Sequence, residues 1–184
     1  MPAPSIAVIV GSLRKGSINA KLARALMKLA GSRLEFQLVE IGDLPLFSQD
    51  LEADLPGAVK RIKAQIEAAD GVLIVSPEYN RGMPGVLKNA IDWASRPYGK
   101  NSFAGKPTAI AGASPGVLGT AVAQQQWRSV FVALDAPTMG QPEVYLQFKD
   151  GAIGDDGAIA SDGTAKFLGG YVDRFVAFVE RYVE

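Results

Sequence analysis

A short apolar run that leads directly into a loop of small residues is the feature that most constrains this chain. Residues 6–10 read Ile-Ala-Val-Ile-Val, a β-branched run typical of a strand buried on both faces of a sheet. Loop 11–19 follows with two glycines, two serines and an arginine, and a helical pattern begins at its end. The backbone N–H groups at such a helix N-terminus are free to bind an anion.

Side chains of this loop can add to that anion site. Ser12, Ser17 and Asn19 carry donors, and Arg14 carries a charged fork that suits phosphate. We therefore expect loop 11–19 to hold a phosphate group, with an ordinary Gly/Ser turn before a capped helix as the alternative. Its glycines are five residues apart and no Lys-Ser/Thr pair closes it, so neither a P-loop nor the dinucleotide fingerprint fits.

The chain of 184 residues contains neither histidine nor cysteine. It therefore lacks the commonest general base, the most reactive nucleophile and the usual soft ligands of zinc or iron. The acidic groupings at residues 50–54 and 155–156 fall short of a calcium-binding pattern, so we predict no metal site. If the protein is an enzyme, we expect a bound organic cofactor to supply the difficult chemistry.

Charge and hydropathy narrow the possible partners. Lys+Arg and Asp+Glu are 19 each, which gives no reason to expect nucleic acid or an anionic membrane as a partner. The first residues lack a basic n-region, and no apolar stretch approaches the ~20 residues that span a bilayer. We expect no signal peptide, no membrane association and a cytoplasmic location.

Strand and helix patterns alternate five times along the chain. The strands are expected at 6–10, 36–41, 71–76, 108–113 and 142–148. Amphipathic helices are expected from 17 to a C-cap at Gly31, over 58–69, from 86, over 122–134 and over 164–183, with a mobile hairpin or loop at 150–163. This alternation predicts one α/β domain over residues 1–184, with a five-stranded parallel sheet and helices on both faces.

Three loops, 11–19, 77–85 and 113–119, each follow a predicted strand. The carboxyl ends of parallel strands share one edge of the sheet, and ligands of such folds bind there, where the strand order reverses. We therefore expect these three loops to form one binding site.

The loop sequences also resemble a known family. The patterns are G-S-x-R-x-x-S-x-N over 11–19, S-P-E-Y-N over 76–80 and L-K-N-A-I-D-W over 87–93. In this order, at the ends of these strands, they resemble the NADPH-dependent FMN reductase family, and within it the bacterial chromate and quinone reductases. The resemblance implies a flavodoxin-like fold, non-covalent FMN and assembly as a homodimer or homotetramer.

The resemblance also implies roles for individual residues. Those expected to bind the FMN phosphate end are Ser12, Arg14, Ser17, Ile18 and Asn19. Those expected along the isoalloxazine ring are Pro77, Glu78, Tyr79 and Asn80, with Ser114 and Gly116 approaching from the third loop. Arg128 and Glu143 match positions that join subunits in the chromate-reductase branch. The alternative interpretation is that Arg128 is an ordinary surface arginine on a polar helix face.

The implied activity is a ping-pong reaction. NAD(P)H would give a hydride to flavin N5, and a quinone, a flavin or an oxyanion such as chromate would then take two electrons, with no catalytic acid or base from the protein. We expect Arg81, Arg96 and Lys100 to favour anionic groups of NADH, NADPH or the acceptor at the flavin's open face. A flavodoxin-type electron-transfer module and a phosphosugar- or nucleotide-binding protein without redox function are the alternatives.

Overall fold

Five parallel strands form the centre of the molecule. The computed structural model describes residues 2–183. The strands are β1 (Ser5–Val10), β2 (Glu35–Leu38), β3 (Gly71–Val75), β4 (Thr108–Ser114) and β5 (Val144–Gln147). They pair in the order β2-β1-β3-β4-β5, and every pair is parallel. The order reverses between β1 and β3, which is the flavodoxin-like arrangement and confirms the predicted fold class.

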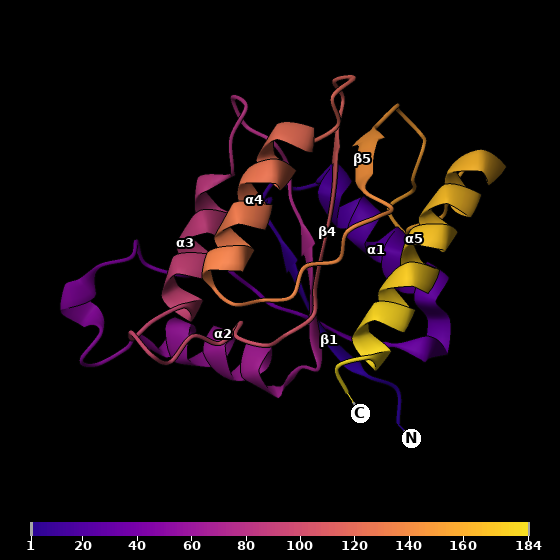
Figure 1. Ribbon diagram of the computed structural model, residues 1–184. Coiled ribbons are helices and arrows are strands. Elements are labelled where there is room, and N and C mark those ends of the chain that lie inside the picture. The colour runs from indigo at the N-terminus through magenta and orange to yellow at the C-terminus, as the bar shows by residue number, and fades with distance from the viewer. Residues whose placement is uncertain (1, 184) are drawn as a thin grey trace.

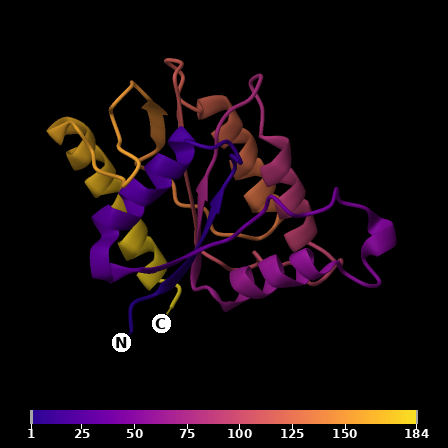
Figure 2. The ribbon, with the colours of Figure 1, turned by 180° about the vertical axis from the view of Figure 1, so that it is seen from behind.

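Helices cover both faces of this sheet (Figures 1 and 2). They are α1 (Ile18–Ala30), α2 (Gly57–Ala68), α3 (Gly85–Ala94), α4 (Ala121–Ala133) and α5 (Asp162–Glu180). Alternate residues of a strand point to opposite faces. Ile6 and Val8 accordingly pack in one core with α1 and α5, whereas Ala7 and Ile9 pack in a second core with α2, α3 and α4.

The ends of α1 follow the sequence signals closely. Ser17 is the N-cap, and its hydroxyl accepts a hydrogen bond from the Ala20 N–H at 3.3 Å. Gly31 is the C-cap, with the positive φ of 58° that glycine adopts without strain. The start of α1, and hence the direction of its free N–H groups, is fixed by local chemistry.

Two strands are shorter than predicted. The ladder of β2 ends at Leu38 and not at 41, and Val39 and Ile41 continue past it into the core beside α2 and α3. Strand β5 begins at Val144 and not at 142, and Glu143, just before it, pairs its carboxylate with Arg128, 3.1 Å away. Among residues 2–183, no helix is long and apolar enough to cross a membrane.

Segment 150–163 contains the predicted hairpin, held by an antiparallel bridge between Ile153 and Ile159. It packs on the outer side of α1: Ile153 is buried, Lys21 pairs with Asp155 at 3.1 Å, and Lys28 pairs with Asp156 at 3.3 Å. The segment therefore covers α1 on the face of the sheet that carries α1 and α5.

Candidate FMN site

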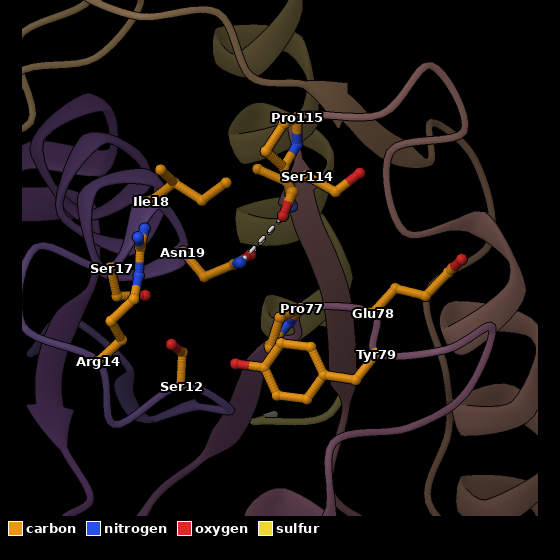
Figure 3. A pocket seen from close by; sticks show the side chains of 11 residues that line it. Ser12, Arg14, Ser17, Ile18, Asn19, Pro77, Glu78, Tyr79, Ser114 and Pro115 are labelled. Carbon is orange, nitrogen blue, oxygen red and sulfur yellow. Dashed lines mark hydrogen bonds between the residues drawn. The ribbon is translucent and has the colours of Figure 1, made fainter.

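A cavity of about 210 Å³ opens at the carboxyl edge of the sheet, where β1, β3 and β4 end. Figure 3 shows its walls, which come from the three loops that the sequence places at this edge. The residues that line it are Ser12, Arg14, Ser17, Ile18, Asn19, Pro77, Glu78, Tyr79, Ala113, Ser114 and Pro115. The reversal of strand order between β1 and β3 opens the crevice at this point.

One end of the cavity is the N-terminus of α1. Ile18 and Asn19 are the first residues of this helix, so their backbone N–H groups precede the intrahelical hydrogen-bond ladder. The hydroxyls of Ser12 and Ser17 lie beside them, and the exposed Arg14 reaches back to the Gly16 carbonyl at 3.4 Å. Donors, a positive charge and the positive end of a helix dipole thus meet at one spot, which is the chemistry that binds a phosphate.

Asn19 has a second task that its sequence position did not reveal. Its amide nitrogen donates to the Ala113 carbonyl at 2.9 Å, and its amide oxygen accepts from the Ala113 N–H at 2.9 Å. The side chain, which is buried, therefore pairs with the end of β4 as a strand neighbour would (Figure 3). It fixes the first wall of the cavity to the third, so its side chain is a brace and its backbone N–H remains the group available to a phosphate.

Glu78 lines the cavity as well, although its carboxylate points away from it. The side chain turns toward α4, where Oε2 accepts from the Ala123 N–H at 3.0 Å (Figure 3). Ala123 is the third residue of α4. The N-cap Thr120 makes no side-chain cap hydrogen bond; its hydroxyl accepts from the side-chain amide of Gln124 at 2.8 Å. Glu78 therefore takes the place of the missing cap, and the loop after β3 is tied to α4.

The next residues form a tight turn at the rim. Tyr79 and Gly82 exchange backbone hydrogen bonds of 3.1 and 2.9 Å, and Asn80 and Arg81 between them have φ values of 51° and 63°. Two central residues with positive φ define a type I′ turn, in which arginine is strained. The Tyr79 ring extends from this turn across the cavity toward Ser12 (Figure 3).

The third loop is pinned by a close backbone contact. Gly119 has a φ of 59°, and a Cβ placed on it would lie 2.5 Å from the carbonyl carbon of Tyr145 in β5. Only glycine permits both this conformation and this approach. The glycine thus holds segment 114–118 over the edge of the sheet, and Ser114 closes the loop with a 3.3 Å hydrogen bond to the Gly116 carbonyl.

Not every predicted site residue lies on the cavity. Asn80 and Gly116 are exposed neighbours of lining residues, and Arg81 projects from the rim turn with 66% of its side chain exposed. Arg96 and Lys100 are not brought to the cavity, because they follow the far end of α3 at the opposite edge of the sheet. Neither residue lines this cavity, and their predicted contact with anionic substrates stays a prediction.

Sequence reasoning also missed two lining residues, Ala113 and Pro115, which carry no functional group that could have signalled them.

Arg128 and Glu143 form an ion pair within the chain, and Arg128 donates a second bond to the Met139 carbonyl at 2.8 Å. Their predicted role between subunits stays a prediction. Among residues 2–183, no three His, Cys, Asp or Glu side chains gather as a metal site would need.

The residues present fit FMN. Phosphate-type donors converge at the α1 end, and the opposite walls, Pro77, Tyr79 and Pro115, offer flat or apolar surface of the kind that a flavin ring contacts. Gly11 allows the first two walls to meet, since a Cβ there would lie 2.9 Å from Leu87 and 3.0 Å from Pro77. The cavity therefore joins an anion site to an apolar face within one crevice.

The sequence as a whole places the chain in a class of enzyme. Residues 4–151 match the profile of the NADPH-dependent FMN reductase family, so the chain belongs to this family of FMN-dependent NAD(P)H oxidoreductases. This confirms the predicted family, enzyme class, cofactor and co-substrate. The roles predicted for the individual residues of loop 11–19 stay predictions.

Individual relatives are similar over nearly their whole lengths. The chain is 52% identical over 174 residues to a 2-hydroxy-1,4-benzoquinone reductase of Burkholderia sp, covering 95% of each. It is 50% identical to a quinone reductase of Pseudomonas putida, covering 96% of this chain and 95% of that one. Among solved structures, FerB, a flavoenzyme NAD(P)H:(acceptor) oxidoreductase of Paracoccus denitrificans, superimposes with a TM-score of 0.94 at 50% identity and covers 98% of this chain and 99% of its own.

Proposed function

We propose that this protein is a cytoplasmic NAD(P)H:quinone oxidoreductase that acts as a single FMN-binding domain. The observation that carries the proposal is the meeting of the α1 N-terminus, Ser12 and Arg14 with the Pro77–Tyr79 wall in one cavity at the switch point of the sheet. Relatives at about half identity are named quinone reductases, which supports a quinone as the acceptor. Free flavin and oxyanions such as chromate are further acceptors that we infer from the family resemblance.

When bound, FMN would supply the redox chemistry, which is acceptance of a hydride from NAD(P)H at N5 and transfer of two electrons to the acceptor in a ping-pong sequence. The protein's task is to bind and orient. Ser12, Ser17 and the Ile18 N–H donate to the phosphate, and Arg14 neutralises its charge.

The cavity is too small to enclose the whole of FMN. About 210 Å³ is less than the roughly 300–1,000 Å³ of a pocket that encloses a whole drug-sized ligand. We infer that the phosphate and its ribityl chain occupy the enclosed part, and that the ring lies on the open rim between the Tyr79 turn and the third loop. An open rim leaves the ring accessible to both NAD(P)H and the acceptor in turn.

Arg81 is the cation placed to attract these substrates. It lies two residues from Tyr79 on the rim, and its side chain makes a 3.8 Å contact with the Glu78 carboxylate. A strained arginine kept in a turn that favours glycine indicates that the side chain is used. We propose that it favours the phosphates of NADH or NADPH, and of anionic acceptors, at the open face.

A comparison of FMN with riboflavin tests the phosphate site, because riboflavin has the same ring and no phosphate. Arg14→Ala should weaken FMN binding about tenfold, the worth of one charge-assisted hydrogen bond of about 1.5 kcal/mol, and leave riboflavin binding unchanged. Lys15→Ala, an adjacent exposed cation that does not line the cavity, is the matched control and should change neither. Equal losses for both ligands, or none for Arg14→Ala, would contradict the proposed orientation.

We also propose that the protein is a homodimer or homotetramer, as the family resemblance implies, with the Arg128–Glu143 pair at a contact between chains. Each of the two side chains is 21% exposed, so part of the pair remains available to a second copy. Light scattering of wild type and Glu143→Gln should show a smaller assembly for the variant. An unchanged mass for Glu143→Gln would limit the pair to its role within the chain.

A further inference from the structure

A chain of two buried hydrogen bonds runs from α4 to the loop under the cavity. The indole Nε1–H of Trp127 donates to the Ser76 hydroxyl at 2.8 Å, and that hydroxyl donates to the Pro77 carbonyl at 2.8 Å. Trp127 and Ser76 are fully buried, with no exposed surface. Neither residue lines the cavity, and both lie directly behind a residue, Pro77, that does.

The last acceptor of these two hydrogen bonds, the Pro77 carbonyl, belongs to the peptide group that joins Pro77 to Glu78. The Pro77 carbonyl and the Glu78 N–H are two ends of one planar amide. A hydrogen bond accepted at the oxygen of an amide draws electron density toward that oxygen and makes the N–H at the other end a stronger donor. Glu78 lines the cavity while its carboxylate is bonded to Ala123 in α4, so we infer that its main chain, with the N–H, faces the cavity.

Helix α4 therefore fixes this amide from two sides. Trp127 reaches it through Ser76, and Ala123, one turn earlier in the helix, holds the Glu78 side chain at 3.0 Å. A buried serine that both accepts from an indole and donates to a carbonyl has one hydroxyl orientation, so the relay has a single direction. The arrangement gives the amide a fixed orientation and a polarised N–H.

We propose that Ser76 and Trp127 are positioning residues that set the reduction potential of the bound FMN through the Glu78 N–H. The inference rests on the proposed site, in which the loop after β3 lies along the ring. Reduction increases the electron density at the polar edge of the ring, so a stronger donor there stabilises reduced FMN more than oxidised FMN. The relay therefore raises the potential.

The test measures the midpoint potential of FMN bound to the whole protein, together with the dissociation constant of oxidised FMN. Ser76→Ala removes both bonds of the relay and should raise the dissociation constant of reduced FMN about threefold to tenfold relative to that of oxidised FMN. For a two-electron couple this lowers the midpoint potential by about 14–30 mV. Trp127→Phe keeps the serine donor and removes only its polarising partner, so a smaller shift in the same direction is expected.

The chain offers a matched control. Trp93 is a second buried tryptophan, in the last turn of α3 and not in the cavity lining, and its Nε1–H donates to the Pro45 carbonyl at 2.8 Å. Trp93→Phe removes the same chemistry and should leave the potential at the wild-type value. Ser76→Ala could fail to fold because it leaves the buried Trp127 N–H without an acceptor. In that case Trp127→Phe and the double variant Ser76→Ala/Trp127→Phe provide the test, since neither contains the indole N–H.

A second readout needs no FMN. In the FMN-free protein, the indole N–H resonance of Trp127 should move in Ser76→Ala, and that of Trp93 should not. A potential unchanged in Ser76→Ala and Trp127→Phe, or shifted equally in Trp93→Phe, would overturn the inference while FMN binding itself stands. Failure of the wild-type protein to bind FMN would instead overturn the proposed function, so the two failures are distinguishable.

Discussion

The brace between Asn19 and Ala113 makes a strong prediction, because two of the three cavity walls depend on one side chain. Asn19→Ala removes two hydrogen bonds of 2.9 Å and leaves the N–H and the carbonyl of Ala113 without their partner. Each buried main-chain group that loses its partner costs about 1–3 kcal/mol. Part of this cost is recovered if water enters from the cavity, so we expect a loss of about 2–4 kcal/mol in the free energy of unfolding.

Urea denaturation of the FMN-free protein measures this loss, and FMN titration measures its consequence for the site. Asn19→Ala should also weaken FMN binding at least about tenfold, because the α1 N-terminus is no longer fixed to the third loop. Asn101→Ala is the matched control: its amide bridges the Leu134 carbonyl and the Phe103 N–H far from the cavity. It should lower stability and leave FMN affinity unchanged. A stability loss below about 0.5 kcal/mol for Asn19→Ala would refute the brace.

Two further changes test the loops around the cavity. Gly119→Ala should lower the free energy of unfolding by at least about 2 kcal/mol, because Gly119 has a positive φ and touches the Tyr145 backbone. Gly116→Ala is the control and should change stability little. Comparable urea midpoints for the two variants would contradict this prediction. Arg81→Gly should raise stability by up to about 1 kcal/mol by relieving the turn, and Arg81→Gly and Arg81→Ala should both raise the KM for NADPH. An unchanged KM in both variants would remove Arg81 from the substrate site.

The fold was predictable from sequence because its signals are local. Apolar runs of five or six residues alternate with amphipathic helices, and Ser17 and Gly31 mark the ends of α1 by the chemistry of their own side chains. The end of β2 was not predictable. The register with β1 ends at Leu38 and the Val39 N–H still donates to the Val8 carbonyl at 2.9 Å, whereas the apolar alternation of a strand continues to Ile41. Burial and pairing are separate properties, and sequence periodicity reports only burial.

The position of the site was predictable for a topological reason, and the tasks of its side chains were not. Parallel strands bring loops 11–19, 77–85 and 113–119 to one edge. The same rule would have placed Arg96 and Lys100, which follow a helix, at the other edge. The pairing of Asn19 with Ala113 spans 94 residues, and that of Glu78 with Ala123 spans 45, so no local pattern reveals them.

The visible spectrum of the purified protein, recorded before and after anaerobic addition of NADPH, is the decisive measurement of whether the cavity holds FMN that NADPH reduces. We expect flavin absorbance that disappears on addition of NADPH and returns when a quinone is added. A protein that holds FMN but stays oxidised with both NADPH and NADH would point to an electron carrier reduced by another protein. A colourless protein that does not bind added FMN would contradict the phosphate site at the start of α1, and with it the proposed function.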